Sequence, residues 1–175
     1  CRVLCDCALD AEHETLTLEW SFLYPGRRRY GEYAPGSGTV ERSGNAIWRR
    51  DAETERRFGL ALGFFGFSGS DGVAALSGVD RIALFIDSAL PELRKSFDIV
   101  AGGGAIGLFD AIPNAEVRCR HVGADADGHC LECRASAGKT VLPWDAVLAA
   151  AVAGKSAFMA AGGIFKLERA TARWL

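Results

Sequence analysis

Apolar and polar side chains alternate near the start of the chain, which is the pattern of half-buried β-strands. In the segment ETLTLEWSFLY (14–24), leucine, leucine, tryptophan and phenylalanine occupy alternate positions, with threonine, glutamate and serine between them. Residues 2–9 (RVLCDCAL) show a similar alternation, and the acidic stretch 10–14 between the two segments has the composition of a turn. The first part of the chain is therefore predicted to form two half-buried strands.

Later segments predict further strands. FGLALGFFGF (58–67) alternates large apolar residues with glycine and alanine, which is typical of a buried strand approached closely by another backbone. DRIALFID (80–87) is a nearly continuous apolar run, which predicts a central strand. Shorter strands are predicted over residues 39–45, 115–122, 129–136, 156–161 and 163–168.

Two segments are better explained as helices. Residues 143–154 are rich in alanine, with a proline ahead of them and a glycine to end them. Residues 88–97 predict a shorter helix, capped by Ser88 and with Pro91 in its first turn. Because predicted strands mostly follow one another, the fold expected is a mainly β, antiparallel β-sandwich with one or two short helices. We expect a single domain over residues 1–175.

Composition and charge narrow the class of partner. The chain has 175 residues, 49% hydrophobic and 24% charged, which is ordinary for a globular domain with its own core. Its formal net charge is -2 and its pI about 5.9, so we expect no basic face and no nucleic-acid partner. No apolar run reaches the roughly 18 residues of a membrane helix, so we expect no direct membrane insertion.

The six cysteines allow several interpretations. A chain of this size can build a core without disulfides, which favours free thiols in a reducing cytosol. Cys130 and Cys133 have the C-x2-C spacing of zinc ligands, and Cys119 could join them in a zinc-stabilised interaction domain. Strand alternation argues against such a site, because it places Cys130 and Cys133 on opposite faces. A small hydrolase using Cys1 or another thiol is a further alternative from the enzyme class.

The segment VRCRHVGADADGHCLECR (117–134) contains three of these cysteines and two histidines. Its DADG stretch resembles half of a calcium loop, but aspartate and glycine are also the residues of a hairpin turn. We predict a β-hairpin whose cysteines fill or flank the core as small apolar side chains.

The order of four segments resembles the TerD-like family of tellurium-resistance and stress proteins. GTVERSGN (38–45) is similar to the family's turn and strand, and VAALSGVDRIALFID (73–87) to its leucine, loop and apolar strand. Residues 114–136 resemble its N-A-x-I-R strand, acidic turn and returning strand. Residues 157–174 are similar to its closing strand, G-E-L-Y-R motif and tryptophan. The resemblance covers most of the chain from residue 38 onward, and the family's N-terminal strands have no clear counterpart, so we expect the domain to lack them.

The resemblance implies a compact β-sandwich, in many members with two bound calcium ions. It also implies a cytoplasmic role in tellurite, phage or chemical-stress resistance, in complexes with other proteins, and no enzymatic activity. We therefore expect a non-enzymatic binding or scaffold module that works in a stress-response complex.

The chain departs from this family where calcium would bind. The calcium ligands that remain are Asp6, Asn45 and Asp51, and the family's G-D-N motif appears as Ser43-Gly44-Asn45, without its aspartate. Arginines are interleaved with the acidic residues that follow, and calcium prefers several oxygen ligands with little positive charge nearby. We expect calcium binding to be weak or absent, and no other cofactor.

Overall fold

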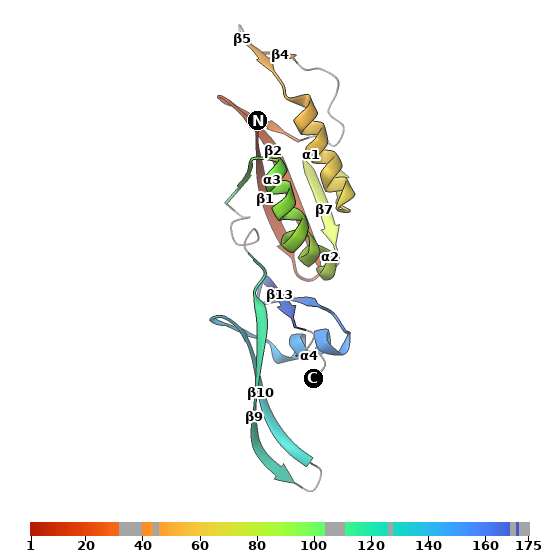
Figure 1. Ribbon diagram of the computed structural model, residues 1–175, viewed down its shortest axis with the longest axis vertical. Helices are drawn as coiled ribbons and strands as arrows, with labels where there is room; N and C mark the ends of the chain where they lie inside the picture. The colour runs from red at the N-terminus through yellow and green to blue at the C-terminus, as the bar shows by residue number, and fades with distance from the viewer. Residues whose placement is uncertain (32–39, 44–45, 104–110, 126–127, 169–170, 172–175) are drawn as a thin grey trace.

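The computed structural model describes residues 1–31, 40–43, 46–103, 111–125, 128–168 and 171. The molecule is elongated, with one β-sheet and its helices at one end and a second β-sheet at the other (Figure 1). This arrangement confirms the predicted mainly β, sandwich-like class with short helices. Two strand pairs, β1 with β8 and β13 with β9, are parallel, whereas the other pairs are antiparallel.

The first sheet is built around the two predicted N-terminal strands. Its strand order is β6-β7-β2-β1-β8, and β3 also pairs with β2. The strands are β1 (Arg2–Asp10), β2 (Thr15–Tyr24), β3 (Arg27–Tyr30), β6 (Ser68–Ser70), β7 (Val73–Ser77) and β8 (Ile99–Ala101). Strands β4 (Val40–Ser43) and β5 (Ala46–Arg49) form a separate two-stranded ribbon.

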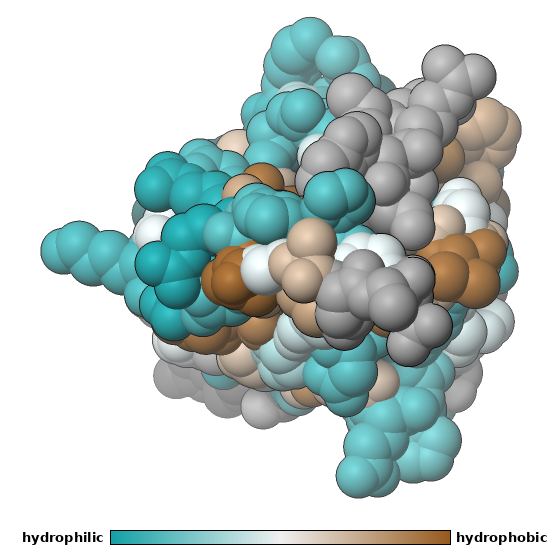
Figure 2. All heavy atoms as spheres, turned by 90° about the horizontal axis from the view of Figure 1, so that it is seen from below, coloured by the Kyte–Doolittle hydropathy of each residue, from teal (hydrophilic) through white to brown (hydrophobic). Residues whose placement is uncertain are grey.

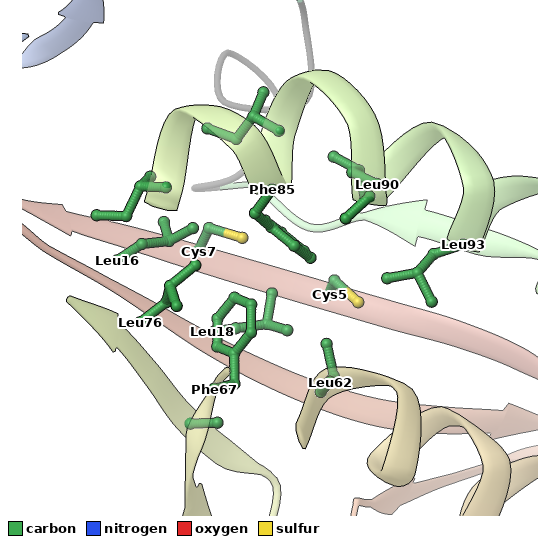
Figure 3. Packing of buried hydrophobic residues seen from close by; sticks show 14 of the residues in the cluster. Cys5, Cys7, Leu16, Leu18, Leu62, Phe67, Leu76, Phe85, Leu90 and Leu93 are labelled. Atoms are coloured by element: carbon green, nitrogen blue, oxygen red, sulfur yellow. The ribbon is translucent and has the colours of Figure 1, made fainter. Parts of the chain in front are cut away.

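Helices pack on one face of the first sheet and enclose its core. They are α1 (Ala52–Phe64) and a continuous helical stretch made of α2 (Val79–Leu84), the π-helical turn η1 (Phe85–Ala89) and α3 (Leu90–Ser96). Figure 3 shows Cys5 and Cys7 of β1 pointing from the sheet toward Phe85 and Leu90 of this stretch. The alternation seen in the sequence therefore buries one face of β1 and β2 under helices.

The second sheet has the order β11-β10-β9-β13-β12. Its core is smaller and lies between the sheet and α4 (Trp144–Val152), with Val147 fully buried. The strands are β9 (Asn114–Asp125), β10 (Gly128–Ala137), β11 (Thr140–Leu142), β12 (Ala157–Ala160) and β13 (Gly163–Leu167). The predicted hairpin, the alanine-rich helix and the two closing strands are confirmed here.

The two ends of the molecule are joined by packing and polar contacts around α2. Ala157 of β12 and Ile164 of β13 contribute to the core of the first sheet. The Ser156 hydroxyl donates a hydrogen bond of 2.8 Å to Asp80, and Lys155 forms an ion pair of 2.7 Å with Glu14. We refer to everything except the outer part of the β9–β10 hairpin as the body.

Two predicted strands are wrong, because both segments are helical. In residues 58–67 a strand would bury every second large residue, but Phe58 and Leu62 are buried whereas Leu60 and Phe64 are exposed. That four-residue spacing is the period of a helix face, and helix α1 covers most of the segment.

Residues 80–87, predicted as the central strand, lie in α2 and η1. Buried residues recur there at helical spacing, with Val79, Ile82, Ala83 and Ile86 at i, i+3, i+4 and i+7 and Phe85 buried beside them. Ser88, predicted to cap a helix, lies inside the π-helical turn and therefore caps nothing. Residues 27–30 form strand β3.

Candidate functional site

The β9–β10 hairpin extends well beyond the strands on either side of it (Figure 1). Strand β13 pairs with β9 only at Asn114 and Ala115, and β11 pairs with β10 only over residues 135–137. Within the described residues, the hairpin beyond these points has no strand beside it. We call residues 116–125 and 128–134 the arm.

The arm has two different faces because its strands alternate. A β-bulge lies between the pairs Cys130–Gly123 and Leu131–His121, where Val122 of β9 has no partner in the register. Directly paired residues share a face on both sides of this bulge. The charged face carries Glu116, Arg118 and Arg120 of β9 and Cys130, Glu132 and Arg134 of β10. The second face carries Val117, Cys119 and His121 of β9 and His129, Leu131 and Cys133 of β10.

On the charged face one ion pair joins the two strands, and two others each lie along a single strand. Glu132 accepts hydrogen bonds from Arg120 (2.6 Å) and from Arg134 (2.7 Å). Arg118 pairs with Glu116 at 3.2 Å. The hydrogen bonds from Arg134 and Arg120 hold the pKa of Glu132 below its usual range. These side chains line a shallow hollow of about 560 Å³.

The charged face has an excess of positive charge. Arg118, Arg120 and Arg134 outnumber Glu116 and Glu132 there by three to two. Arg118 and Arg134 are also direct cross-strand partners, an arrangement that is unfavourable for like charges. The face is therefore suited to an acidic group.

On the second face a disulfide bond joins the two strands. It links Cys119 to Cys133, which are direct partners in the register. The expectation that all six cysteines are free thiols is wrong for this pair, whereas Cys1, Cys5, Cys7 and Cys130 are free. Zinc needs thiolates, so a site with Cys119, Cys130 and Cys133 requires the reduced protein. Cys130 also lies on the opposite face from Cys133, as the alternation predicts.

Two histidines lie beyond the disulfide on this face. His121 Nε2 and His129 Nδ1 are 3.1 Å apart, so one ring donates a hydrogen bond to the other. Both side chains are exposed, and so are Val122 and Leu131, which are 54% and 52% accessible. Seen from the hairpin end of the molecule, most of the surface is hydrophilic, with small apolar patches among polar residues (Figure 2).

The two calcium candidates in the described residues are not brought together. Asp6 lies opposite Glu19 on the sheet face away from the helices, with Arg28 Nη2 4.0 Å from its carboxylate. Asp51 instead caps α1 and accepts a hydrogen bond of 3.1 Å from the Thr54 amide. That cap lies beside Tyr24, roughly 16 Å farther along β2 than Glu19.

Asn45, the third candidate, lies outside the described residues. Among the residues that are described, no three histidine, cysteine or acidic side chains form a group that could hold a metal ion. Weak or absent calcium binding therefore stays a prediction.

A buried ionic cluster was missed by sequence reasoning. The Glu55 carboxylate is 1% exposed and contacts Arg50 Nη2 at 2.5 Å and the Tyr24 hydroxyl at 2.5 Å. Burial and the hydrogen bond to Glu55 raise the pKa of Tyr24 to about 12. Glu55 lies three residues before Phe58, so correct assignment of the helix would have placed it on the buried face. The cluster ties α1 to β2 and supports the fold.

The buried thiols of β1 are poor nucleophiles. Cys5 and Cys7 point into the core of the first sheet, and burial raises the pKa of both thiols, that of Cys7 to about 12. The reactive form of cysteine is the thiolate, so both side chains act as apolar packing groups at neutral pH.

Comparisons with known proteins leave the interpretation to the geometry. No family model matches the chain, and neither a curated protein nor a solved structure matches it. No helix in the described part of the chain is long and apolar enough to cross a membrane.

Proposed function

We propose that the protein is a non-enzymatic binding module that presents the β9–β10 arm to a protein partner. The observation that carries this proposal is the extension of the arm past both neighbouring strands, with most of its described residues exposed. A projecting, half-unpaired hairpin contributes little to a core, and yet it is braced by a disulfide bond and a cross-strand ion pair. Such bracing suits an element whose shape matters for recognition.

The composition of the arm favours a protein partner. The arm exposes the apolar side chains of Val122 and Leu131 and also carries three arginines, and the centres of protein interfaces are more apolar than the rest of the surface and enriched in arginine. The sequence carries a net charge of -2, so non-specific attraction to nucleic acid is not favoured.

The TerD-like resemblance supplies the biological setting of the proposal. In that setting the partner is another protein of a stress-response complex, and the module itself catalyses nothing. The resemblance includes residues 114–136, which contain the arm.

Site-specific photo-crosslinking in the native cell tests the proposal. A photoreactive phenylalanine analogue at Leu131 is compared with the same analogue at Val152, which is 78% exposed on α4 of the body. We expect a discrete crosslinked protein from position 131 and none, or a different one, from position 152. Equal crosslinking from both positions, or from position 152 alone, contradicts the proposal.

A further inference from the structure

We propose that the free edge of β9, from Glu116 to His121, receives an extended segment of the partner as an additional strand, and that this segment alternates acidic and apolar residues. The inference rests on the proposed function and specifies the chemistry of the partner. We call this additional strand the partner segment.

One backbone edge of β9 is open beyond Ala115 in the described residues. Strand β13 occupies the β9 edge only at Asn114 and Ala115, and its last paired residue is Leu167. From Glu116 onward, no other strand in the described residues lies on that side of β9. An unpaired strand edge is a template for another strand, and β-augmentation is a recurring mode of peptide recognition. The partner segment would continue the position of β13 along β9.

Two positively charged side chains lie on the strand that forms this edge. Arg118 and Arg120 are successive side chains of β9 on the charged face, and both are well exposed. A strand paired with β9 places alternate side chains directly beside these two arginines. Acidic residues at those positions would offset the unfavourable placement of Arg118 opposite Arg134.

The opposite face of the same strand is less polar. There, Val117 and the Cys119–Cys133 disulfide are the neighbours of the same edge. Val117 packs against the core beneath α4, so the apolar surface of the body continues onto the arm. The intervening side chains of the partner segment would lie on this surface, which explains why they should be apolar.

A second copy of the chain fits this edge less well. If two β9 edges paired antiparallel about Cys119, Arg118 of one copy would lie opposite Arg120 of the other, and Arg120 opposite Arg118. Two pairs of like charges would then meet directly across the strands, an unfavourable arrangement. The charges therefore disfavour self-association about Cys119, and self-association in another register is one of the outcomes that the test below distinguishes.

Charged side chains and bulges also protect exposed edges from aggregation. That explanation accounts for the bulge at Cys130 and for single charges along the arm. It does not account for two arginines held directly opposite each other, a cost that edge protection does not require. The arginine pair is the feature that favours recognition of an acidic strand.

The test uses a fluorescent peptide of alternating glutamate and valine, titrated with the whole protein at low salt. Peptides with lysine or serine in place of glutamate serve as charge controls. We expect binding of the glutamate peptide and at least tenfold weaker binding of the others. Hydrogen exchange should slow on binding at the alternate amides of residues 116–121 that face away from β10, because they gain backbone partners.

Backbone methylation separates strand pairing from charge attraction. Two peptides carry N-methyl groups on alternate residues. In one peptide these groups block one hydrogen-bonding edge of the extended chain, and in the other peptide they block the opposite edge. Only one edge can pair with β9, so we expect one peptide to lose binding and the other to retain it. Equal binding by both would overturn the proposal, because the attraction would then be electrostatic without a strand.

Charge reversal tests the role of the arginines. The double variant R118E/R120E should bind the glutamate peptide at least tenfold more weakly and prefer the lysine peptide. Its fold is checked by circular dichroism, and the lysine preference itself shows that the edge is intact. Unchanged preference for the glutamate peptide would overturn the proposal. Self-association of the parent protein that protects residues 116–121 would overturn it too, since the occupant would be a second copy.

Failure of the inference is distinguishable from failure of the proposed function. Specific crosslinking at Leu131 without binding of the glutamate peptide would leave the arm as a binding element for a different chemistry. Absence of both would remove the proposed function as well.

Discussion

The body and the arm use similar strands for different ends. In the body, Trp20, Phe22 and Phe58 are almost completely buried between the first sheet and its helices, with ring centroids of Phe22 and Phe58 6.1 Å apart. In the arm, Val122 and Leu131 stay about half exposed, and cross-strand contacts are ionic or covalent. The comparison teaches that stability and recognition can be located in separate parts of one chain, so substitutions should separate them.

The largest effect is expected in the core of the body. Phe58→Ala removes a ring that contacts Trp20, Phe22 and Phe97, and it leaves a cavity. We expect the free energy of unfolding to fall by about 4 kcal/mol, measured by urea denaturation. The control is Leu60→Ala, two residues away and 56% exposed, which should change stability far less. Similar losses from both variants would contradict the helical placement of α1.

A slightly smaller effect is expected from the buried ionic cluster. Glu55→Gln keeps the shape of the side chain but removes the negative charge of its buried ion pair with the Arg50 guanidinium, which is 7% exposed. We expect a loss of about 3 kcal/mol, because removing one charge of a buried ion pair is costly. The control is Glu53→Gln, two residues earlier in α1, which removes an exposed ion pair with Arg56 and should be nearly neutral. Equal stability of the two variants would show that the cluster is solvated.

The smaller core under α4 should be less sensitive. Val147→Ala removes two methyl groups from a fully buried side chain, which should cost about 2 kcal/mol in urea denaturation. Val152→Ala makes the same change at an exposed position of the same helix and should cost almost nothing. If binding of a partner also fell in Val147→Ala at native conditions, the separation of body and arm would be incomplete.

The smallest effect concerns acidification of the arm. The folded pKa of Glu132 is lowered, so its ion pairs stabilise the arm above the unfolded pKa, about 4.5, and are lost as the pH falls through the folded value. We expect amide exchange in the arm, corrected for its intrinsic pH dependence, to be steady above that range and to rise below it. In Glu132→Gln this rise should be absent. A rise centred near neutral pH would contradict the role of Glu132.

The sequence predicted most of what depends on local periodicity. Alternation located β1, β2 and the β9–β10 hairpin, and it placed Cys130 and Cys133 on opposite faces. It failed in FGLALGFFGF, because alternate glycines and large residues satisfy a strand and a helix at once. Only packing decides between the strand and the helix. In the helix, Phe58 and Leu62 are buried against the sheet, whereas Leu60 and Phe64 are exposed to solvent.

The candidate site depended on information that the sequence lacks. The Cys119–Cys133 disulfide follows from the hairpin register, which sets these two residues opposite each other across 14 positions. The free edge of β9 follows from where β13 stops pairing, and no local pattern marks that point. The calcium candidates were taken from the order of segments, which does not specify that Asp6 and Asp51 lie at separate places.

One measurement tests the separation of body and arm most directly. Residues 119–133 are replaced by an Asn-Gly turn, which can join Arg118 and Arg134 because they are direct cross-strand partners. The account predicts that the shortened protein unfolds in urea as cooperatively as the parent, within about 1 kcal/mol, and no longer binds the partner that crosslinks at Leu131. Loss of cooperative unfolding, or full retention of partner binding, would contradict it.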